Sequence, residues 1–183
     1  GQWRGTGNLT EEVNTIAGTG TAGFSGDGGP AGLAQISNID GMATSPDGSI
    51  YLADSNNRRI RKVSPLHVIT TIAGDGTQCH SVFDPSYPAC GDGGPATQAH
   101  LDFTNEIAVG RDGSLYLSDY GLNRIRRIGP DGVISTVAGS GAICFPQNAP
   151  CGDGGPATLA QISAGPIALG TDGSLYIAEY NRH

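Results

Sequence analysis

The chain carries the hexapeptide Gly26-Asp27-Gly28-Gly29-Pro30-Ala31 and repeats it unchanged at residues 91–96 and 152–157. An Asp-Gly-Ser-x-Tyr motif follows each copy, at residues 47–51, 112–116 and 172–176. A basic segment comes next in the first two copies, at residues 59–63 and 124–128. Motifs that recur in the same order at nearly equal spacing are the signature of a repeat architecture, in which every copy forms the same unit.

Each repeat is predicted to form four short antiparallel strands. The second copy has four runs rich in aliphatic residues, separated by turns that contain glycine: residues 105–109, 114–119, 124–128 and 133–137. The first copy has the same set, at residues 41–44, 50–54, 60–63 and 68–72. None of these runs has a helical period. Four-stranded sheets repeated at a fixed interval are the blades of a β-propeller, so the fold class is predicted to be all-β and of propeller type.

The repeat also predicts how the chain is divided. We expect the end of a preceding blade, two complete blades and the first half of another, over residues 1–18, 19–74, 75–139 and 140–183. Residues 13–18 align with residues 134–139 and are expected to be a fourth strand, and residues 2–7 take the place of a third strand with a poor match. The chain is then expected to join other copies head to tail, or to be part of a longer chain that holds the remaining blades.

Four cysteines lie around two proline-containing loops. Pairing of Cys79 with Cys90 and of Cys144 with Cys151 is favoured, because each pair brackets one loop. Free thiols are one alternative, and a four-cysteine zinc site is another, although zinc ligands prefer about two to four residues between cysteines. Paired cysteines indicate an oxidising compartment, extracellular or periplasmic. The sequon at Asn8 is a candidate glycosylation site that fits secretion.

Composition excludes several classes of function. The 183 residues are 37% hydrophobic and contain no apolar run long enough to cross a membrane, so membrane insertion is not expected. No signal peptide is visible at the start. The net charge of −7 repels phosphate backbones and anionic lipid, which disfavours nucleic acid as a partner.

The recurring acids are predicted to be structural. Asp27, Asp92 and Asp153 could offer oxygens to calcium, but an aspartate beside glycine more often accepts backbone N–H bonds within its own turn. Another acid ends the second strand of every repeat and is expected to pair across the hairpin or hold the turn: Asp54, Asp119 and Glu179. A recurring tyrosine is expected in the core between neighbouring sheets: Tyr51, Tyr116 and Tyr176.

No catalytic residue, metal ligand or cofactor is predicted. The histidines lie in dissimilar settings without a metal-binding spacing: His67, His80, His100 and His183. The segments that differ most between repeats are residues 80–89 and 143–150, and such loops on a rigid scaffold are candidates for recognition. Phe83, Tyr87 and Phe145 are candidate partner-binding anchors, with packing over their own disulfides as the alternative.

The motifs resemble NHL repeats over essentially the whole chain. The resemblance rests on the Asp-Gly-Ser-x-Tyr-Leu-x-Asp run, on Arg-Ile-Arg-Lys-Val and on Ile-Thr-Thr-Ile-Ala-Gly-Asp-Gly. The loops that end in Cys-Gly-Asp-Gly-Gly, at residues 90–94 and 151–155, are similar to those of the NHL propeller of teneurins and of bacterial teneurin-like proteins with Rhs or YD repeats. This resemblance implies a six-bladed ring, of which three repeats supply half, and a non-catalytic extracellular module used in adhesion or in a toxin-related shell.

Three hypotheses of function follow. The first is an extracellular module that binds a protein partner. The second is a structural subunit that assembles with copies of itself into a ring or filament, by exchanging strands of incomplete terminal blades. The third is a metal-dependent lyase, because NHL propellers include a zinc lyase that splits peptidyl-hydroxyglycine.

Overall fold

The computed structural model describes residues 14–79, 90–144 and 151–180. Within these residues the chain forms ten strands: β1 (Ile39–Thr44), β2 (Ile50–Asp54), β3 (Arg59–Val63), β4 (Ile69–Ala73), β5 (Thr104–Val109), β6 (Leu115–Asp119), β7 (Arg124–Ile128), β8 (Ile134–Ala138), β9 (Ala164–Leu169) and β10 (Leu175–Glu179). It also forms five short 3-10 turns: η1 (Ala31–Leu33), η2 (Ser55–Asn57), η3 (Ala96–Gln98), η4 (Tyr120–Leu122) and η5 (Ala157–Leu159).

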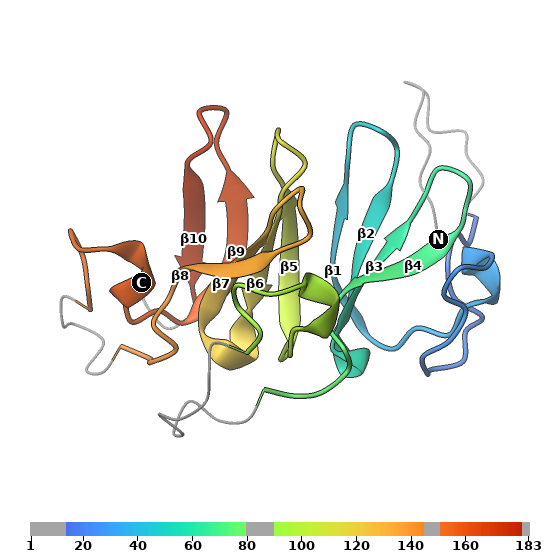
Figure 1. Ribbon diagram of the computed structural model, residues 1–183, viewed down its shortest axis with the longest axis horizontal. Coiled ribbons are helices and arrows are strands. Elements are labelled where there is room, and N and C mark those ends of the chain that lie inside the picture. Colours follow the sequence, from blue (N-terminus) through green and yellow to red (C-terminus); the bar gives the residue numbers. More distant parts are fainter. Residues whose placement is uncertain (1–13, 80–89, 145–150, 181–183) are drawn as a thin grey trace.

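The strands form three antiparallel sheets that stand side by side (Figure 1). Their orders are β1-β2-β3-β4, β5-β6-β7-β8 and β10-β9, so successive strands are always neighbours. The first strand of each sheet contacts the first strand of the next, since β5 lies against both β1 and β9. Sheets that meet along their first strands and repeat in this way are the blades of a β-propeller, which confirms the predicted fold class.

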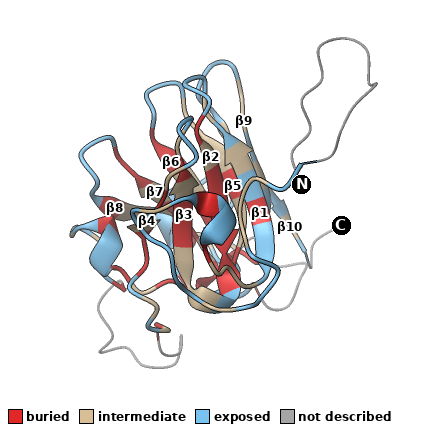
Figure 2. Ribbon diagram, turned by 90° about the vertical axis from the view of Figure 1, so that its right-hand side faces the viewer, coloured by how far each residue is buried: buried red, intermediate tan, exposed pale blue. Residues whose placement is uncertain are grey.

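Each pair of neighbouring sheets is joined by an apolar interface. Side chains alternate between the two faces of a strand, so every sheet has two faces. We call the face that carries Tyr51, Ala53 and Ile60 the outgoing face of the first sheet, and it packs against Leu115 and Leu117 of the second sheet. We call the face that carries Leu115 and Leu117 the incoming face of that sheet. Figure 2 shows the buried residues in the middle of the strands and the exposed ones at the turns.

The second interface repeats the first. Ile125 and Ala138 on the outgoing face of the second sheet pack against Ile162 and Ala164, with Leu175 partly buried beside them. Radial packing therefore depends on one rule, in which the outgoing face of each sheet covers the incoming face of the next.

The two inner strands β1 and β5 approach each other unusually closely. A Cβ added to Gly41 of β1 would lie 2.7 Å from the carbonyl oxygen of Asn105 and 2.8 Å from the Cα of Glu106. Both strands also shift register near this point, between Ile39 and Met42 in β1 and between Thr104 and Glu106 in β5. Glycine is required at position 41 because any side chain would separate the two sheets.

The strand expected over residues 13–18 is not formed, and that prediction is wrong for the described residues. Asn14 makes a single bridge, and the residues that follow it are irregular. The amide of Gly18 nevertheless donates to Ala31 O at 3.0 Å, as Gly74 donates to Ala96 O at 2.9 Å after β4. The segment thus lies where a fourth strand ends, but its expected neighbour over residues 2–7 lies outside the described residues.

The recurring tyrosines do not share one environment. Tyr51 is 8% exposed and belongs to the core between the first two sheets, as expected. Tyr116 is half-buried, and Tyr176 is 61% exposed, which contradicts the expectation that it lies in the core. The difference arises because the outgoing face of β9 and β10 has no sheet packed on it among the described residues.

Candidate functional site

A buried arginine holds the glycine-rich loop of the first blade. Arg61 of β3 is fully buried, and its guanidinium donates to Asp27 Oδ1 at 2.8 Å and to Ser25 O at 3.0 Å. Asp27 Oδ2 accepts a further hydrogen bond from the hydroxyl of Thr71 in β4 at 2.7 Å. The loop is therefore fixed to the two outer strands of its own blade.

The second blade repeats this arrangement. Arg126 of β7 is fully buried and donates to Asp92 Oδ1 through Nη2 at 2.6 Å and through Nε at 3.0 Å. Asp92 Oδ2 accepts from the backbone amide of Thr136 at 2.9 Å. The expectation that Asp27 and Asp92 bond within their own turns is wrong, because buried guanidinium groups need a counter-charge that water cannot supply.

The acids that end the second strands accept hydrogen bonds from the loop before the first strand of their blade, which the sequence did not predict; the expected pairing across the hairpin is present for Asp54, whose Oδ2 lies 3.3 Å from Arg61 Nη1. Asp54 Oδ1 accepts from the amide of Ser37 at 2.7 Å, and Asp119 Oδ1 accepts from the amide of Asp102 at 3.0 Å. In the third sheet, Glu179 accepts from the amide of Ser163 at 3.2 Å.

The two complete blades differ beside these buried acids. In the first blade, Asn57 Nδ2 lies 2.8 Å from Asp54 Oδ1 and 2.9 Å from Asp54 Oδ2, and it also donates to Gly23 O at 2.7 Å. Leu122 takes the place of Asn57 in the second blade and packs against Cys79 and Cys90. The sequence places Asn57 and Leu122 at the same repeat position, so this difference could have been noticed before the structure.

Because Leu122 has no amide group, Asp119 lacks the hydrogen-bond donor that Asn57 provides to Asp54. The Oδ2 atom of Asp119 is buried and accepts no hydrogen bond from the described part of the chain. Arg126 Nη1 lies 3.8 Å from this oxygen, whereas the equivalent distance from Arg61 Nη1 to Asp54 Oδ2 is 3.3 Å. Burial raises the pKa of Asp119 to about 7, against the opposing charge of Arg126.

Both disulfides are present in the pairing that the sequence favoured. Cys79 is bonded to Cys90 and Cys144 to Cys151, and the described residues contain no free cysteine. The free-thiol and zinc alternatives for these four residues are therefore wrong. The candidate contact residues Phe83, Tyr87 and Phe145, the candidate glycosylation site Asn8, and both His80 and His183 lie outside the described residues.

The two described histidines lie in different parts of the fold and do not form a common site. His67 lies in the turn between β3 and β4, and His100 Nε2 lies 3.3 Å from Asp75 Oδ2. Across residues 14–79, 90–144 and 151–180 there is no group of three or more His, Cys, Asp or Glu side chains placed to hold a metal ion.

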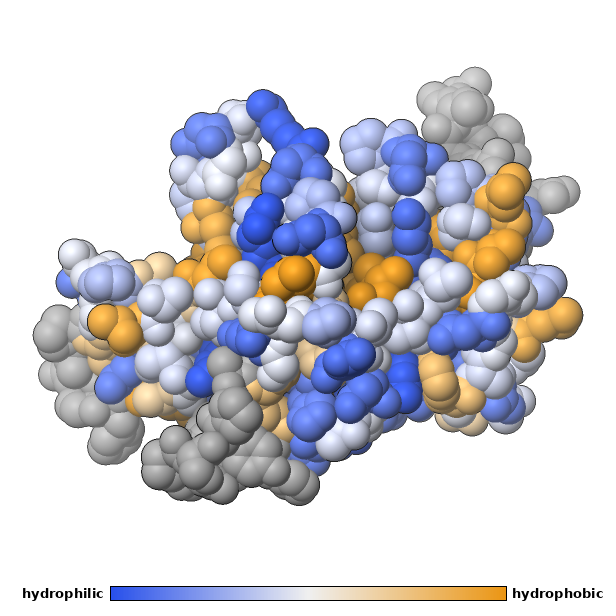
Figure 3. Space-filling model, viewed as in Figure 1, coloured by the Kyte–Doolittle hydropathy of each residue, from blue (hydrophilic) through white to orange (hydrophobic). Residues whose placement is uncertain are grey.

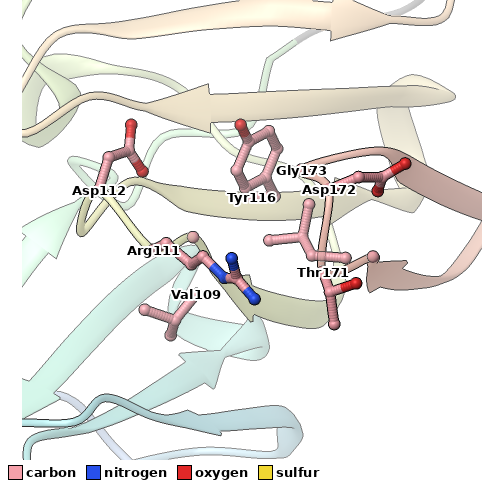
Figure 4. Close-up of a pocket in the computed structure, with 10 residues that line it drawn as sticks. Val109, Arg111, Asp112, Tyr116, Thr171, Asp172 and Gly173 are labelled. Atoms are coloured by element: carbon pink, nitrogen blue, oxygen red, sulfur yellow. The ribbon is translucent and has the colours of Figure 1, made fainter.

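A groove of about 480 Å³ lies between the second and third sheets. The β5–β6 turn lines it with Arg111 and Asp112, and β6 lines it with the half-buried Tyr116. The β9–β10 turn lines it with Thr171 and Asp172 (Figure 4). The hairpin turns at the top of the molecule are mainly hydrophilic, and hydrophobic side chains lie lower, along the sheets (Figure 3). Sequence reasoning identified both turns but missed the groove, because it forms only when two blades stand side by side.

Both aspartates of this groove are held in the charged form. Hydrogen bonds from Ser114, supported by Arg127, lower the pKa of Asp112 to about 2. The backbone and side chain of Ser174 lower the pKa of Asp172 in the same way. The groove therefore offers fixed charges and polar contacts near neutral pH, not a carboxyl group suited to exchange protons with a substrate.

The comparisons with known proteins agree with this architecture. Residues 66–151 match the teneurin NHL domain family. Teneurin-1 of Mus musculus is 36% identical over 143 residues, which cover 73% of this chain and 5% of that protein. Teneurin-4 of Homo sapiens is 39% identical over 107 residues, which cover 54% of this chain and 4% of that protein.

The chain also aligns with a protein of known structure. A Bacteroides thetaiotaomicron protein of unknown function aligns with a TM-score of 0.50 and 25% identity, over 73% of this chain and 30% of that one. The chain spans only a small part of the length of the teneurins that it matches. No helix in the described ranges has the length and apolar character that a membrane span requires.

The radial sheets and their repeated motifs define a β-propeller of the NHL type. Within that class, the chain is similar to the NHL domain of teneurins.

Proposed function

We propose that the chain is a non-catalytic extracellular module that binds a protein partner, in adhesion or in a related interaction. The observation that carries this proposal is the placement of the disulfides. Each one closes a segment in which the repeats differ, while the rest of every blade keeps the same framework. A rigid scaffold with pinned, variable loops is the usual design of a recognition surface.

The Cys79–Cys90 bridge is also anchored to the second blade. Leu122, at the end of η4, packs against both cysteines in a buried cluster. The first blade uses the hydrogen bond from Asn57 to Gly23 O at the equivalent place. In the second blade, the Cys79–Cys90 disulfide packed on Leu122 thus takes the place of the hydrogen bond between Asn57 and Gly23 O. The sequence of residues 80–89 can then vary while the disulfide stays attached to the blade.

Two further observations support a role outside the cell and without catalysis. Disulfides persist in oxidising compartments, and the similarity to teneurins implies an extracellular setting. Asp27, Asp54, Asp92 and Asp119 are all engaged by buried arginines, which assigns these recurring acids to the scaffold.

A bead assay tests this function. Beads coated with the chain should adhere to cells of the organism that makes it, and a Phe83→Ala/Tyr87→Ala/Phe145→Ala variant should adhere at least tenfold less. Leu66→Ala is the matched control, because Leu66 is 85% exposed in the β3–β4 turn and belongs to neither segment that a disulfide closes. Equal adhesion by the triple variant would contradict the proposed contact surface, and stoichiometric zinc with activity that chelation abolishes would favour a lyase.

A further inference from the structure

The groove between the second and third sheets contains a cation that the scaffold does not use. Arg111 of the β5–β6 turn lines the groove, and Figure 4 shows its guanidinium extending into it, on the side of Thr171. Within the described ranges, Arg111 is the one lysine or arginine whose side chain makes no hydrogen bond or ion pair. The others all have a partner: Arg58, Arg59, Arg61, Lys62, Arg124, Arg126 and Arg127.

The two aspartates of the groove do not neutralise this cation. Asp112 Oδ2 accepts a hydrogen bond from Arg127 Nη2 at 2.9 Å, and Asp172 Oδ2 accepts one from the hydroxyl of Ser174 at 2.8 Å. In Figure 4 both carboxylates point away from Arg111. A carboxylate from outside the chain can therefore pair with Arg111 without displacing a contact of the scaffold.

Arg111 also differs from the residues that build the blades. The ion pair between Asp112 and Arg127 has a counterpart in the first blade. The repeat position of Arg111 is instead held by Pro46 in the first blade and by Thr171 in the third. A charge that the other blades replace with uncharged residues is not required by the fold, so this side chain is available for binding.

The rest of the lining suits an apolar group. Val109 at the end of β5 and Leu169 at the end of β9 line the groove, together with the half-buried ring of Tyr116. Both walls belong to described hairpins, on the inner side of the sheets where β5 contacts β9. The volume of about 480 Å³ falls within the range of about 300 to 1,000 Å³ that is typical of small-molecule sites.

We propose that this groove binds a carboxylate that carries an apolar or aromatic body. The guanidinium of Arg111 offers paired N–H donors, which match the two oxygens of a carboxylate. The hydroxyl of Thr171 can donate a further hydrogen bond from the facing turn, and Val109, Leu169 and Tyr116 cover the apolar body.

The groove lies at the opposite end of the second sheet from the Cys79–Cys90 disulfide. Strand β6 begins at the turn that lines the groove and ends at η4, where Leu122 packs against both cysteines. The inference therefore goes beyond the proposed adhesion function, and its failure would leave that function untouched.

Titration of the intact, nitrogen-15-labelled chain with hydrocinnamate, followed by NMR at constant ionic strength, tests the proposal. A ligand of this size that fits the groove should bind with a dissociation constant of about 4 mM or tighter. The amide signals of Gly110 and Gly170, which line the two walls, should shift together to saturation. Hydrocinnamamide has the same body without the charge and should bind at least tenfold more weakly, because the charged hydrogen bonds are lost.

Arg111→Gln is the decisive variant. It should weaken the binding of hydrocinnamate at least tenfold, and Thr171→Val should weaken it by about threefold. Lys62→Gln is the matched control, since it removes the same charge from the first sheet, and it should bind as the wild type does. Equal thermal midpoints for the variants and the wild type would show that folding is intact.

A blocked dipeptide of phenylalanine and glutamate identifies the source of the carboxylate. Tighter binding of the dipeptide than of hydrocinnamate supports the site as one for an acidic side chain of a partner protein, and the reverse order supports it as one for a free organic acid. The proposal would be overturned if neither probe gave saturable shifts up to about 40 mM, ten times the expected dissociation constant. It would also be overturned if Arg111→Gln bound hydrocinnamate as tightly as the wild type, or if hydrocinnamate and its amide bound equally well.

Discussion

Folding stability should fall as the pH rises from about 5 to about 7, because of one buried carboxyl group. Burial raises the pKa of Asp119 from 3.8 to about 7 in the folded chain. Between these two values the folded chain therefore holds one more proton than the unfolded chain, and stability decreases with increasing pH. A difference of one bound proton changes the free energy of unfolding by about 1.4 kcal/mol per pH unit. Because Asp119 is only partly protonated near pH 7, the total loss of stability between pH 5 and pH 7 is about 2 kcal/mol.

The acids with strongly lowered pKa values do not contribute to this pH dependence of the unfolding free energy. Hydrogen bonds to serine hold the pKa of both Asp47 and Asp112 at about 2, so these acids take up protons only at much lower pH. Arg126, Asp102 and Arg124 are the charged groups that act on Asp119. The measurement needs a reference protein that differs from the wild type at Asp119 alone.

Asp119→Asn is that reference. An asparagine keeps an oxygen that can accept the hydrogen bond from the amide of Asp102, and it binds no proton. Urea unfolding at several pH values, followed by circular dichroism, should show that the wild type loses about 2 kcal/mol more than the variant from pH 5 to pH 7. Parallel curves for the two proteins would refute the reasoning, as would a wild type that gains stability over this range relative to the variant.

The variant Leu122→Asn tests whether the missing hydrogen-bond donor is the reason for the raised pKa of Asp119. It places amide donors beside Asp119, as Asn57 does beside Asp54 in the first blade. These donors favour the charged carboxylate and should lower the pKa of Asp119, so the slope between pH 5 and pH 7 should become shallower. A slope as steep as that of the wild type would mean that the missing donor is not the reason for the raised pKa.

Three further perturbations test the scaffold. Asp92→Asn should destabilise the fold by about 3 kcal/mol in urea unfolding, since fully buried Arg126 loses its closest counter-charge; a loss below about 0.5 kcal/mol would contradict this. Gly41→Ala should cost about 2 kcal/mol or more by forcing two backbones apart, whereas Gly32→Ala, with open space around its Cβ, should change the unfolding midpoint little. Cys79→Ser should lower stability by about 3 kcal/mol under non-reducing conditions and by nothing under reducing ones.

Much of the fold follows from local patterns in the repeat. The strands at residues 50–54 and 124–128 have the predicted bounds, because each lies between tight turns with a residue of positive φ: Gly48 and Arg58 around the first strand, and Asn123 and Gly132 around the second. The disulfide pairing also follows, since each cysteine pair brackets one short loop.

Properties that depend on a neighbouring blade could not be predicted from one repeat. Tyr51 and Tyr176 have the same motif but very different exposure, because burial is set by the sheet that packs on them. The bond between Asp27 and Arg61 spans 34 residues, so local turn preferences pointed to the wrong partner. The groove beside Tyr116 was missed for the same reason, since its two walls come from different blades.

Amide hydrogen exchange, resolved along the chain, tests the radial stacking of the sheets most directly. The sheet of β5 to β8 is covered on both faces, whereas the sheet of β1 to β4 is covered by a neighbouring sheet on one face and the pair β9–β10 has an exposed outgoing face. The account predicts the slowest exchange in β5, β6 and β7 and the fastest in β10. Equal protection in all three sheets, or slowest exchange in β9 and β10, would contradict it.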